Sequence, residues 1–505
     1  MSDGARQSPR GESEPPADTF GPLGNAERLN WLNAKNRCAK TSDQRGMCPP
    51  TVGVKHRCRR VCSTASPVVM PSKGPCPRVA AVEPPEPTWE DVLSRIIDDS
   101  HLVTGDQLST MLDGAVRPLG LTAEVLVVDL AQQVLTPVQP RPGKPVAVEG
   151  TIAGRAYQLG EIHSSGEGGS RGRALWVPML DGADRTGVLR IGLPPHMVDD
   201  GLLRRRCWVL AGLLGHLVIS KLASSERLRW MRSGDSLSAS AELLWQLLPP
   251  RTSATDRLVV TTLLEPWDQV AGDAYDYAVN SGDAFLAVFD GAGHDLQAGH
   301  DTALAITAIR LARRSGVTDL AALAEHADDL LTTQPRPVRF VTAVLASLDT
   351  DSGVLQYVLA GHPPPLLLRR GRAVKHLAHP PRTPLGLPGT PADRLTVGRE
   401  HLEPGDRLLL YSDGITEARD ADGEFFGEQR LVDFTRRAEL AGLPAPETLR
   451  RLTAAVLAHQ GGQLQDDATL VLVDWSTTAS QRLFPAFGSG SPTDDPRGQP
   501  RGRPR

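Results

Sequence analysis

The chain has 505 residues, of which 40% are hydrophobic, and its formal net charge is −4. This length predicts about three domains. The acidic balance, and basic residues that are spread out without interleaved aromatic residues, argue against a nucleic-acid partner. The most apolar stretch, Cys207 to Ser220, is shorter than the roughly 18 residues that a membrane-spanning helix needs, and the polar N-terminus lacks the apolar region of a secretory signal. We therefore expect a soluble, cytoplasmic protein without a membrane partner.

Residues 1–86 are rich in Pro, Ser, Gly, Arg and Lys and have no apolar periodicity. Such a segment cannot bury enough apolar surface to offset the entropy lost on ordering, so we expect a disordered leader. It holds five of the six cysteines, namely Cys38, Cys48, Cys58, Cys62 and Cys76. A zinc site built from Cys48, Cys58, Cys62 and His56 is an alternative, although no ligand-pair spacing recognised for zinc occurs twice.

A first folded domain is predicted over residues 87–197. Thr88 and Asp91 have the spacing of a helix-capping box ahead of spaced apolar residues. Apolar residues at helical spacing run from Leu108 to Leu119, and β-rich runs follow at 124–130, 173–180 and 186–191. A helix followed by antiparallel strands predicts a small α+β sensor-like fold. The passages 149–157 and 174–182 resemble a divergent GAF domain.

Residues 198–250 are predicted to form a helical linker or switch. Leu203, Leu210 and Leu217 repeat every seven residues, which is the period of a coiled coil. The repeat predicts either a short coiled coil that joins two copies as a homodimer, or one amphipathic helix packed on its own domain. A second helical stretch ends at Pro249-Pro250, because proline lacks the N–H that a helix needs and its ring clashes with the preceding turn.

A second folded domain is predicted over residues 251–476. Its β-rich runs are Leu258–Leu264, Ala284–Phe289, Val341–Leu348, Val354–Leu359, Leu408–Leu410 and Leu470–Val473, and its helical stretches are 298–315, 320–333, 428–438 and 446–460. Strands grouped with long helices between them predict layers of α and β structure, so the fold class is α+β. Residues 477–505 are rich in Pro, Gly and Arg and are expected to form a disordered tail.

Four aspartates, far apart in this second domain, each lie on a short turn beside an apolar run. They are Asp273, Asp290, Asp413 and Asp466. Carboxylates held close together raise each other's pKa, and a hard divalent cation relieves the repulsion. The glycines after Asp290 let the backbone approach a ligand closely, so that a carboxylate and a main-chain carbonyl can face one ion. A lone Asp-Gly is a common turn, but four such elements in order point to a metal-dependent hydrolase.

Residues 243–474 resemble the SpoIIE/RsbU-type protein phosphatases of the metal-dependent PPM class. The segments that carry the resemblance include Gly272–Asp276, Asp290–His294, Phe340–Thr342, Ala360–Pro364, Tyr411–Ala418 and Asp466-Asp467. The resemblance implies an αββα sandwich with two Mn²⁺ or Mg²⁺ ions at one edge of its sheets. It also implies the ligand roles, in which Asp290 bridges both ions, the Gly291 carbonyl and Asp273 serve one ion, and Asp413 and Asp466 hold the other, with Asp467 as the alternative to Asp466.

The implied reaction is hydrolysis of phosphoserine or phosphothreonine by a water that the metals activate. Residues 251–476 contain no cysteine, which excludes a cysteine-phosphatase mechanism in this domain. His294 and His362 are candidates for the general acid that protonates the leaving oxygen, and the alternative role for His362 is a hydrogen bond to a loop. The usual substrate in the family is a small phosphorylated anti-sigma-factor antagonist of bacterial signalling.

The sequence departs from the family pattern at Ala271, Ala274 and Asp295. Asp295 follows His294 where glycine is usual, and aspartate tolerates the left-handed backbone region better than most residues. A fifth acid there could tune metal affinity or hinder a phosphate anion, and it is the only support for the alternative of a non-catalytic scaffold. A metal phosphodiesterase or small-molecule phosphatase is a third possibility. Because all four expected aspartates are present, we predict an active enzyme.

Overall fold

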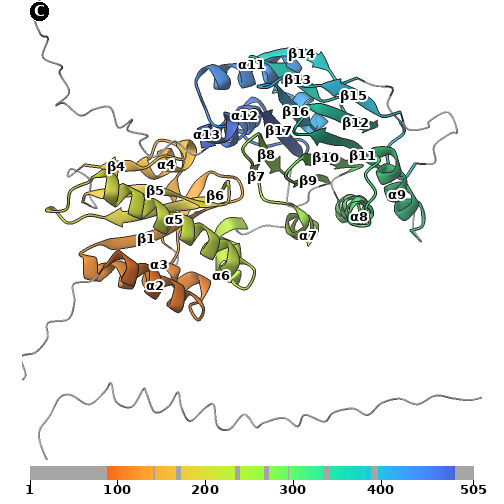
Figure 1. The fold of residues 1–505 in the computed structure, drawn as a ribbon. Coiled ribbons are helices and arrows are strands. Elements are labelled where there is room, and N and C mark those ends of the chain that lie inside the picture. The colour runs from red at the N-terminus through yellow and green to blue at the C-terminus, as the bar shows by residue number, and fades with distance from the viewer. Residues whose placement is uncertain are drawn as a thin grey trace, which may run out of the picture. The chain divides into compact units, whose positions relative to one another are not determined.

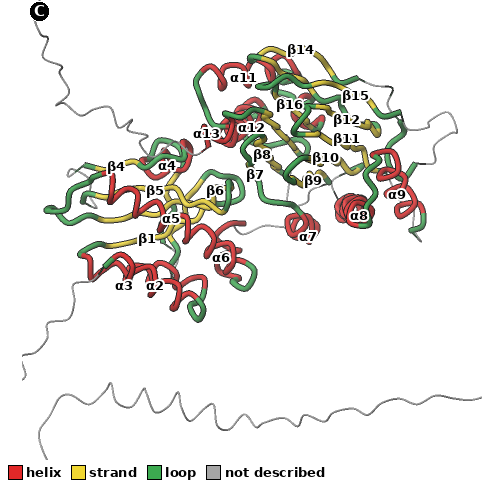
Figure 2. Tube along the Cα trace, viewed as in Figure 1, coloured by secondary structure: helices red, strands yellow, loops and turns green. Residues whose placement is uncertain are grey.

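The computed structural model describes residues 88–483, except 140, 142, 167–171, 234–238, 267–271, 294, 335–339, 379, 381 and 388–395. The predicted leader with its five cysteines lies outside the described residues, as do Ala271, His294 and most of the predicted tail. Figures 1 and 2 show the chain coloured along its length and by secondary structure.

The first domain consists of a six-stranded antiparallel sheet in the order β3-β2-β1-β6-β5-β4 and the helices around it. Its strands are β1 (Thr122–Val128), β2 (Val134–Pro137), β3 (Val146–Ala147), β4 (His163–Ser165), β5 (Ala174–Asp181) and β6 (Asp184–Gly192). Its helices are α2 (Trp89–Ser100), α3 (Leu108–Val116), α4 (Ile152–Leu159), α5 (Gly201–Leu222) and α6 (Glu226–Ser233), with short 3₁₀ turns at Gly105–Gln107 and Arg117–Leu119. The predicted capping box is confirmed, because Thr88 and Asp91 cap α2 reciprocally.

Alternating residues of β1 show how the two faces of this sheet are covered. Val125 and Val127 belong to a core shared with α2, α3 and α5, whereas Leu126 and Val128 belong to a second core with α4. The α+β prediction for this domain is therefore confirmed. Its likeness to a GAF domain stays a prediction from the sequence.

Helix α5 packs on its own domain. Leu203, Leu210 and Leu214 are at most 7% exposed and lie in the core between α5 and the sheet. Leu217 packs against the same core as a partly buried residue. The seven-residue repeat is thus used inside the domain, and the homodimeric coiled coil predicted from it is wrong for these leucines. In the described ranges no single helix is long and apolar enough to cross a membrane, and α5 passes that test only together with α6, across a bend of 105°.

The second domain is preceded by α7 (Ala239–Leu247) and contains two sheets. The five-stranded sheet consists of β9 (Asp273–Val279), β10 (Asp283–Gly291), β11 (Val341–Asp349), β12 (Val354–Ala360) and β15 (Gly398–His401). The six-stranded sheet consists of β7 (Thr252–Ala254), β8 (Leu258–Glu265), β13 (Leu366–Arg369), β14 (Arg372–His376), β16 (Arg407–Tyr411) and β17 (Ala468–Trp475). The helices are α8 (Leu296–Arg314), α9 (Leu320–Thr332), α10 (Asp413–Thr416), α11 (Gly427–Leu440), α12 (Ala445–His459) and α13 (Ala479–Leu483).

The helices and sheets of this domain lie in layers (Figure 1), and three apolar cores lie between these layers. One core lies between α8 and α9 and the five-stranded sheet, a second lies between the two sheets, and a third lies between the six-stranded sheet and α11 and α12. The predicted αββα sandwich is therefore confirmed. The tail was predicted to be disordered from residue 477, but its first residues include the helix α13, whose Leu483 packs against Ala183 and Val259.

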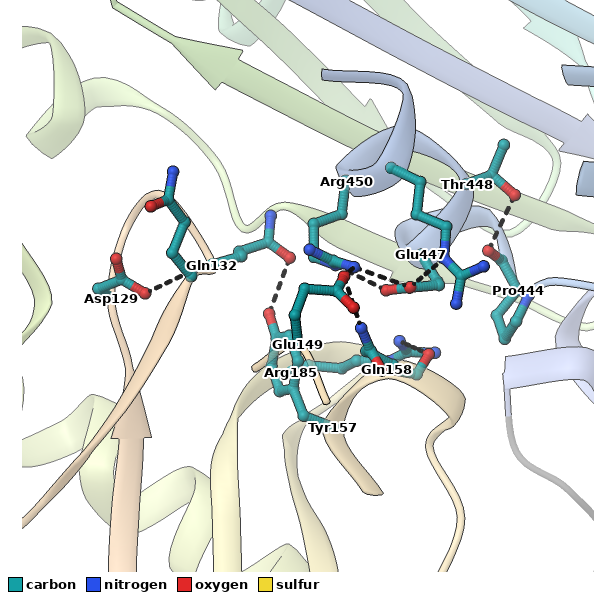
Figure 3. A network of polar contacts seen from close by, with 12 residues as sticks. Asp129, Gln132, Glu149, Tyr157, Gln158, Arg185, Pro444, Glu447, Thr448 and Arg450 are labelled. Atoms are coloured by element: carbon teal, nitrogen blue, oxygen red, sulfur yellow. Dashed lines mark hydrogen bonds and ion pairs between the residues drawn. The ribbon is translucent and has the colours of Figure 1, made fainter. Parts of the chain in front are cut away.

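A polar network joins α4 of the first domain to α12 of the second through the exposed Glu149 (Figure 3). Glu447 on α12 is 1% exposed and accepts hydrogen bonds from Arg450 Nε at 2.8 Å and Arg451 Nε at 2.6 Å. Arg450 also reaches Glu149, which in turn accepts a hydrogen bond from Gln158 Nε2 at 3.0 Å. Because both members of the Glu447–Arg450 pair are buried, removing either one would leave a costly buried charge.

Candidate metal centre

Asp273 and Asp290 lie opposite each other at one edge of the five-stranded sheet. Asp273 is the first residue of β9 and pairs in register with Asp290 near the end of β10. Gly291 follows as the last residue of β10, and its N–H donates to the Gly272 carbonyl at 3.1 Å. A Cβ atom at Gly291 would lie 2.6 Å from Thr302 Oγ1, so a larger residue does not fit there. The strand pairing thus fixes two predicted ligands side by side.

Asp413 and Asp466 come from the other sheet. Asp413 is the first residue of α10 and is separated from the end of β16 by Ser412, while Asp466 stands two residues before β17. Strands β16 and β17 are neighbours, with Tyr411 paired to Leu470, so both aspartates lie at the same end of this sheet. The close approach requires Gly414, because a Cβ atom there would lie 2.0 Å from the Asp467 carbonyl oxygen.

Asp467 connects the two sheets at this edge. Its Oδ2 accepts hydrogen bonds from the backbone N–H of Gly272 at 2.6 Å and from that of Asp273 at 3.3 Å, and the residue is 3% exposed. Thr469 reinforces the link, since its hydroxyl donates to Asp273 Oδ2 at 2.8 Å. The neighbouring Asp466 is exposed. Asp467 therefore has a structural task, which leaves Asp466 as the carboxylate available to an ion.

The charges of these carboxylates act on one another. Burial, followed by the negative charges of Asp413, Asp466 and Asp467, raises the pKa of Asp290 to about 7. Burial and then Asp290 raise the pKa of Asp273 well above its ordinary value. Burial and then Asp466 raise the pKa of Asp413. Aspartates from four chain segments therefore form one electrostatically coupled cluster.

The donors of this cluster fit a hard divalent cation. Among the described residues, no three His, Cys, Asp or Glu side chains are arranged closely enough to hold an ion by themselves. Mg²⁺ commonly uses only one or two carboxylates and keeps several waters, and the Gly291 carbonyl adds a further oxygen. Burial raises the pKa values of these carboxylates most and their neighbouring negative charges raise them further, so a bound cation would relieve part of the cost of ionising them.

Most of the second domain matches a known protein family. Residues 280–476 match the family model described as Stage II sporulation protein E (SpoIIE). Over 246 residues, the chain is 25% identical to the phosphoserine phosphatase RsbU of Bacillus subtilis, and the match covers 47% of this chain and 69% of RsbU. Residues 280–476 therefore form a SpoIIE-type domain. The PPM phosphatases that the sequence resembles are metal-dependent.

Other proteins are similar to the SpoIIE-type domain over shorter or more distant matches. Protein IcfG of Synechocystis sp. is 32% identical over 135 residues, which is 26% of this chain and 20% of IcfG. The chain thus spans about a fifth of that relative. A crystal structure of the RsbU and RsbW domains of Rv1364c from Mycobacterium tuberculosis is 24% identical, covers 46% of this chain and 62% of that chain, and has a TM-score of 0.38.

Asp295, which departs from the family pattern, caps a helix. Its Oδ1 accepts hydrogen bonds from the N–H groups of Gln297 and Ala298, both at 3.1 Å, at the start of α8. Its φ of −101° is extended, so the left-handed conformation that the sequence suggested for this position is wrong. Aspartate is among the preferred residues at such a position. The substitution of glycine by aspartate thus has a local explanation.

His362 is buried beside the cluster. It is 4% exposed, and its Nδ1 lies 2.8 Å from Thr342 Oγ1, which in turn lies 3.4 Å from Asp290 Oδ2. Burial lowers the pKa of His362 to about 4. The imidazole is therefore neutral near pH 7, which disfavours the general-acid role, and its hydrogen bond goes to Thr342 on strand β11 and not to the loop of the alternative prediction. His294, the other candidate, lies outside the described residues.

The buried His362 predicts a pH dependence of stability. Its pKa in the folded state is about 4, below the unfolded value of about 6.5, so its contribution is present above pH 6.5 and is lost as the pH falls toward 4. We expect wild-type protein to lose about 2 kcal/mol more than His362→Gln between pH 7 and pH 4.5. Urea unfolding of both proteins at the two pH values measures the difference, and equal losses would contradict the neutral, buried histidine.

Thr302, Thr342 and Thr469 hold the backbone and carboxylates of the site but were not predicted individually. Thr302 Oγ1 donates to the Gly272 carbonyl at 2.7 Å. Thr342 belongs to Phe340–Thr342, one of the segments that carry the family resemblance, whereas Thr469 lies outside those segments. A threonine two residues after the acidic pair was the available signal for Thr469.

The two adjacent acids are expected to respond differently to truncation. Asp467→Ala leaves two buried N–H groups without their acceptor, which costs about 2–4 kcal/mol of stability. Asp466→Ala removes an exposed side chain, so we expect less than about 1 kcal/mol of change together with loss of metal-dependent activity. Denaturant unfolding of the metal-free variants, followed by a phosphatase assay, separates the two effects. An active Asp466→Ala variant would show that Asp466 is not a ligand.

Proposed function

We propose that this protein is a metal-dependent phosphoserine/phosphothreonine protein phosphatase of bacterial signalling. The observation that carries the proposal is the convergence of Asp290, Asp413 and Asp466 from two different sheets at one edge of a SpoIIE-type domain. Separate segments of the chain thus supply the carboxylates, and the charges of Asp413 and Asp466 act on Asp290. By analogy with the family, we expect the protein to act in the cytoplasm.

We expect each residue of the site to have a separate role. Asp290 would bridge two Mn²⁺ or Mg²⁺ ions, Asp273 and the Gly291 carbonyl would serve one, and Asp413 and Asp466 would serve the other. When bound, such ions lower the pKa of a shared water and neutralise charge on a phosphoryl group. Thr342 orients Asp290, and Asp467 holds Asp273 in place through the backbone of β9.

The expected substrate is a phosphorylated protein of the anti-sigma-factor antagonist type. This expectation follows from the similarity to RsbU, whose name states a phosphoserine phosphatase activity. The first domain would then sense a signal or a partner, and the helices of residues 198–250 would transmit it. A non-catalytic scaffold is the alternative, and its support is weaker now that Asp295 is explained as a helix cap.

Turnover of defined substrates tests the proposal. The full chain is incubated with phosphoserine, phosphothreonine and phosphotyrosine peptides and with p-nitrophenyl phosphate, with and without Mn²⁺, and phosphate release is measured. We expect Mn²⁺-dependent turnover that favours the serine and threonine peptides. Tight capture of a phosphoprotein by both wild type and Asp290→Asn, without any turnover, would support the scaffold instead. Preferential hydrolysis of small phosphate esters or diesters would point to a small-molecule enzyme.

A further inference from the structure

A cavity of about 490 Å³ lies away from the metal centre, where the last turn of α5, helices α6 and α7 and the chain leading into β7 meet. This volume falls within the range of small-molecule sites. Its apolar wall includes Leu130, Ile219, Leu222, Trp245, Leu248 and Tyr275. Its charged wall includes Arg229, Arg232, Arg251, Asp181, Asp184 and Glu242. The lining therefore combines a large apolar surface with a few charged groups.

Two of the lining side chains carry buried hydrogen-bond donors without acceptors. Arg232 Nε and Trp245 Nε1 are shielded from solvent, and within the described residues neither has a hydrogen-bond partner. Buried donors are nearly always satisfied in folded proteins, and each one left unsatisfied costs about 1–3 kcal/mol. An acceptor that enters the cavity would remove that cost.

Most other charged groups on the wall already have partners. Arg229 donates to the Ala223 carbonyl at 2.8 Å, and Glu242 accepts from Gln246 at 2.9 Å. Asp181 contacts His216. Arg251 donates to the Leu130 carbonyl and stacks on the Trp245 ring at 5.4 Å. The donors of Arg232 and Trp245 are therefore the groups on this wall that a ligand could satisfy.

We propose that this cavity binds a small organic anion with an aromatic or apolar body, whose carboxylate, sulfonate or phosphate accepts hydrogen bonds from Arg232 and Trp245. The apolar wall takes the body of the ligand, and the guanidinium supplies the charge that selects an anion over a neutral molecule.

The position of the cavity would allow a bound ligand to affect the metal centre. Tyr275 lines the cavity and belongs to β9, whose first residue is Asp273. Trp245 and Leu248 pack against the core between the two sheets. Bound ligand would thus contact both α6 of the first domain and the strand that carries a predicted metal ligand. This coupling, unlike the binding itself, rests on the proposed phosphatase function.

Binding is tested by titrating the metal-free full chain with 8-anilinonaphthalene-1-sulfonate, an aromatic sulfonate whose fluorescence rises in apolar surroundings. We expect one saturable site per chain, with competition by benzoate. Arg232→Met, which keeps the bulk of the side chain and removes its charge, should weaken binding at least tenfold. Arg257→Met, which removes an exposed arginine paired with Asp351, serves as the matched control and should bind as wild type does.

A cavity-filling variant keeps the test decisive if Arg232→Met does not fold. Ala223→Trp adds a large side chain at an exposed position on the cavity wall, and it should abolish binding while circular dichroism stays unchanged. Absence of saturable binding, or equal affinity in wild type, Arg232→Met and Ala223→Trp, would overturn the proposed site. Because binding is measured without turnover, its failure is distinguishable from a failure of the proposed phosphatase activity.

Discussion

Asp290→Asn is expected to lower Mn²⁺-dependent phosphatase turnover about 10³-fold. Asp290 lies at the centre of the coupled carboxylates, opposite Asp273 and under the influence of Asp413 and Asp466. A bridging carboxylate holds both ions, and metal ions stabilise several kcal/mol of transition-state charge, where each 1.36 kcal/mol corresponds to a factor of ten in rate. The initial rate of p-nitrophenyl phosphate hydrolysis at saturating Mn²⁺ measures the loss.

The matched control for this variant is Asp283→Asn, which makes the same chemical change on the same strand. Asp283 is exposed and bonds only locally, with its Oδ2 accepting from Asn280. Its substitution should leave turnover within about twofold of wild type. If Asp290→Asn retained more than a tenth of wild-type turnover, Asp290 could not be the bridging ligand.

Adding saturating Mn²⁺ to metal-free protein is expected to raise the melting temperature by roughly 10 °C. A ligand at 100 times its dissociation constant stabilises the folded state by about 2.7 kcal/mol for each site, and 1 kcal/mol shifts the melting temperature by about 2–4 °C in a domain of this size. Chelation with EDTA should reverse the shift. Differential scanning fluorimetry of wild type and Asp290→Asn makes the comparison.

The size of this shift should depend on pH. Without metal, the pKa of Asp290 in the folded protein is about 7, above the unfolded value of about 3.9. Its stabilising contribution is thus full below pH 4 and is lost as the pH rises through 7, so Mn²⁺ should stabilise the protein more at pH 8 than at pH 6. An Asp290→Asn variant should be more stable than wild type without metal at pH 8 and should respond less to Mn²⁺. Equal Mn²⁺ responses of the two proteins would argue against a metal centre at this residue.

The regular elements of the second domain could be predicted because their sequences carry the pattern locally. The apolar run of β10 and the long helices α8, α9 and α12 correspond to stretches that the sequence delimited to within a few residues. The capping box of α2 was predictable for the same reason, since Thr88 and Asp91 satisfy each other within one turn.

Other elements depend on contacts that are distant in sequence. The sequence of β9 resembles a polar turn because it contains Asp276. In the structure this aspartate is buried, and its carboxylate oxygens lie 2.7 Å from an Arg310 nitrogen and 3.1 Å from an Arg313 nitrogen. Every residue of β14 is exposed, so this edge strand has no apolar pattern. For α5, the periods 3.5 and 3.6 cannot be told apart over three leucines, and only the fold shows that they face their own domain.

The sequence predicted which aspartates belong to the site but not how they are arranged. Four separated aspartates could be selected because each stands near a strand end and all but Asp466 adjoin a glycine. The different roles of Asp466 and Asp467 could not be predicted. They depend on which carboxylate accepts the hydrogen bond from the Gly272 N–H between the two sheets. The same limit applies to His362, whose burial depends on tertiary packing.

Anomalous diffraction at the manganese edge, from crystals grown with Mn²⁺, tests the central claim most directly. The claim predicts two peaks about 3.5–4 Å apart, with the Asp290 carboxylate between them, the Gly291 carbonyl beside one peak and Asp413 and Asp466 beside the other. Peaks elsewhere in the molecule, or none at all in a well-ordered domain, would show that these carboxylates serve some purpose other than binding catalytic metal.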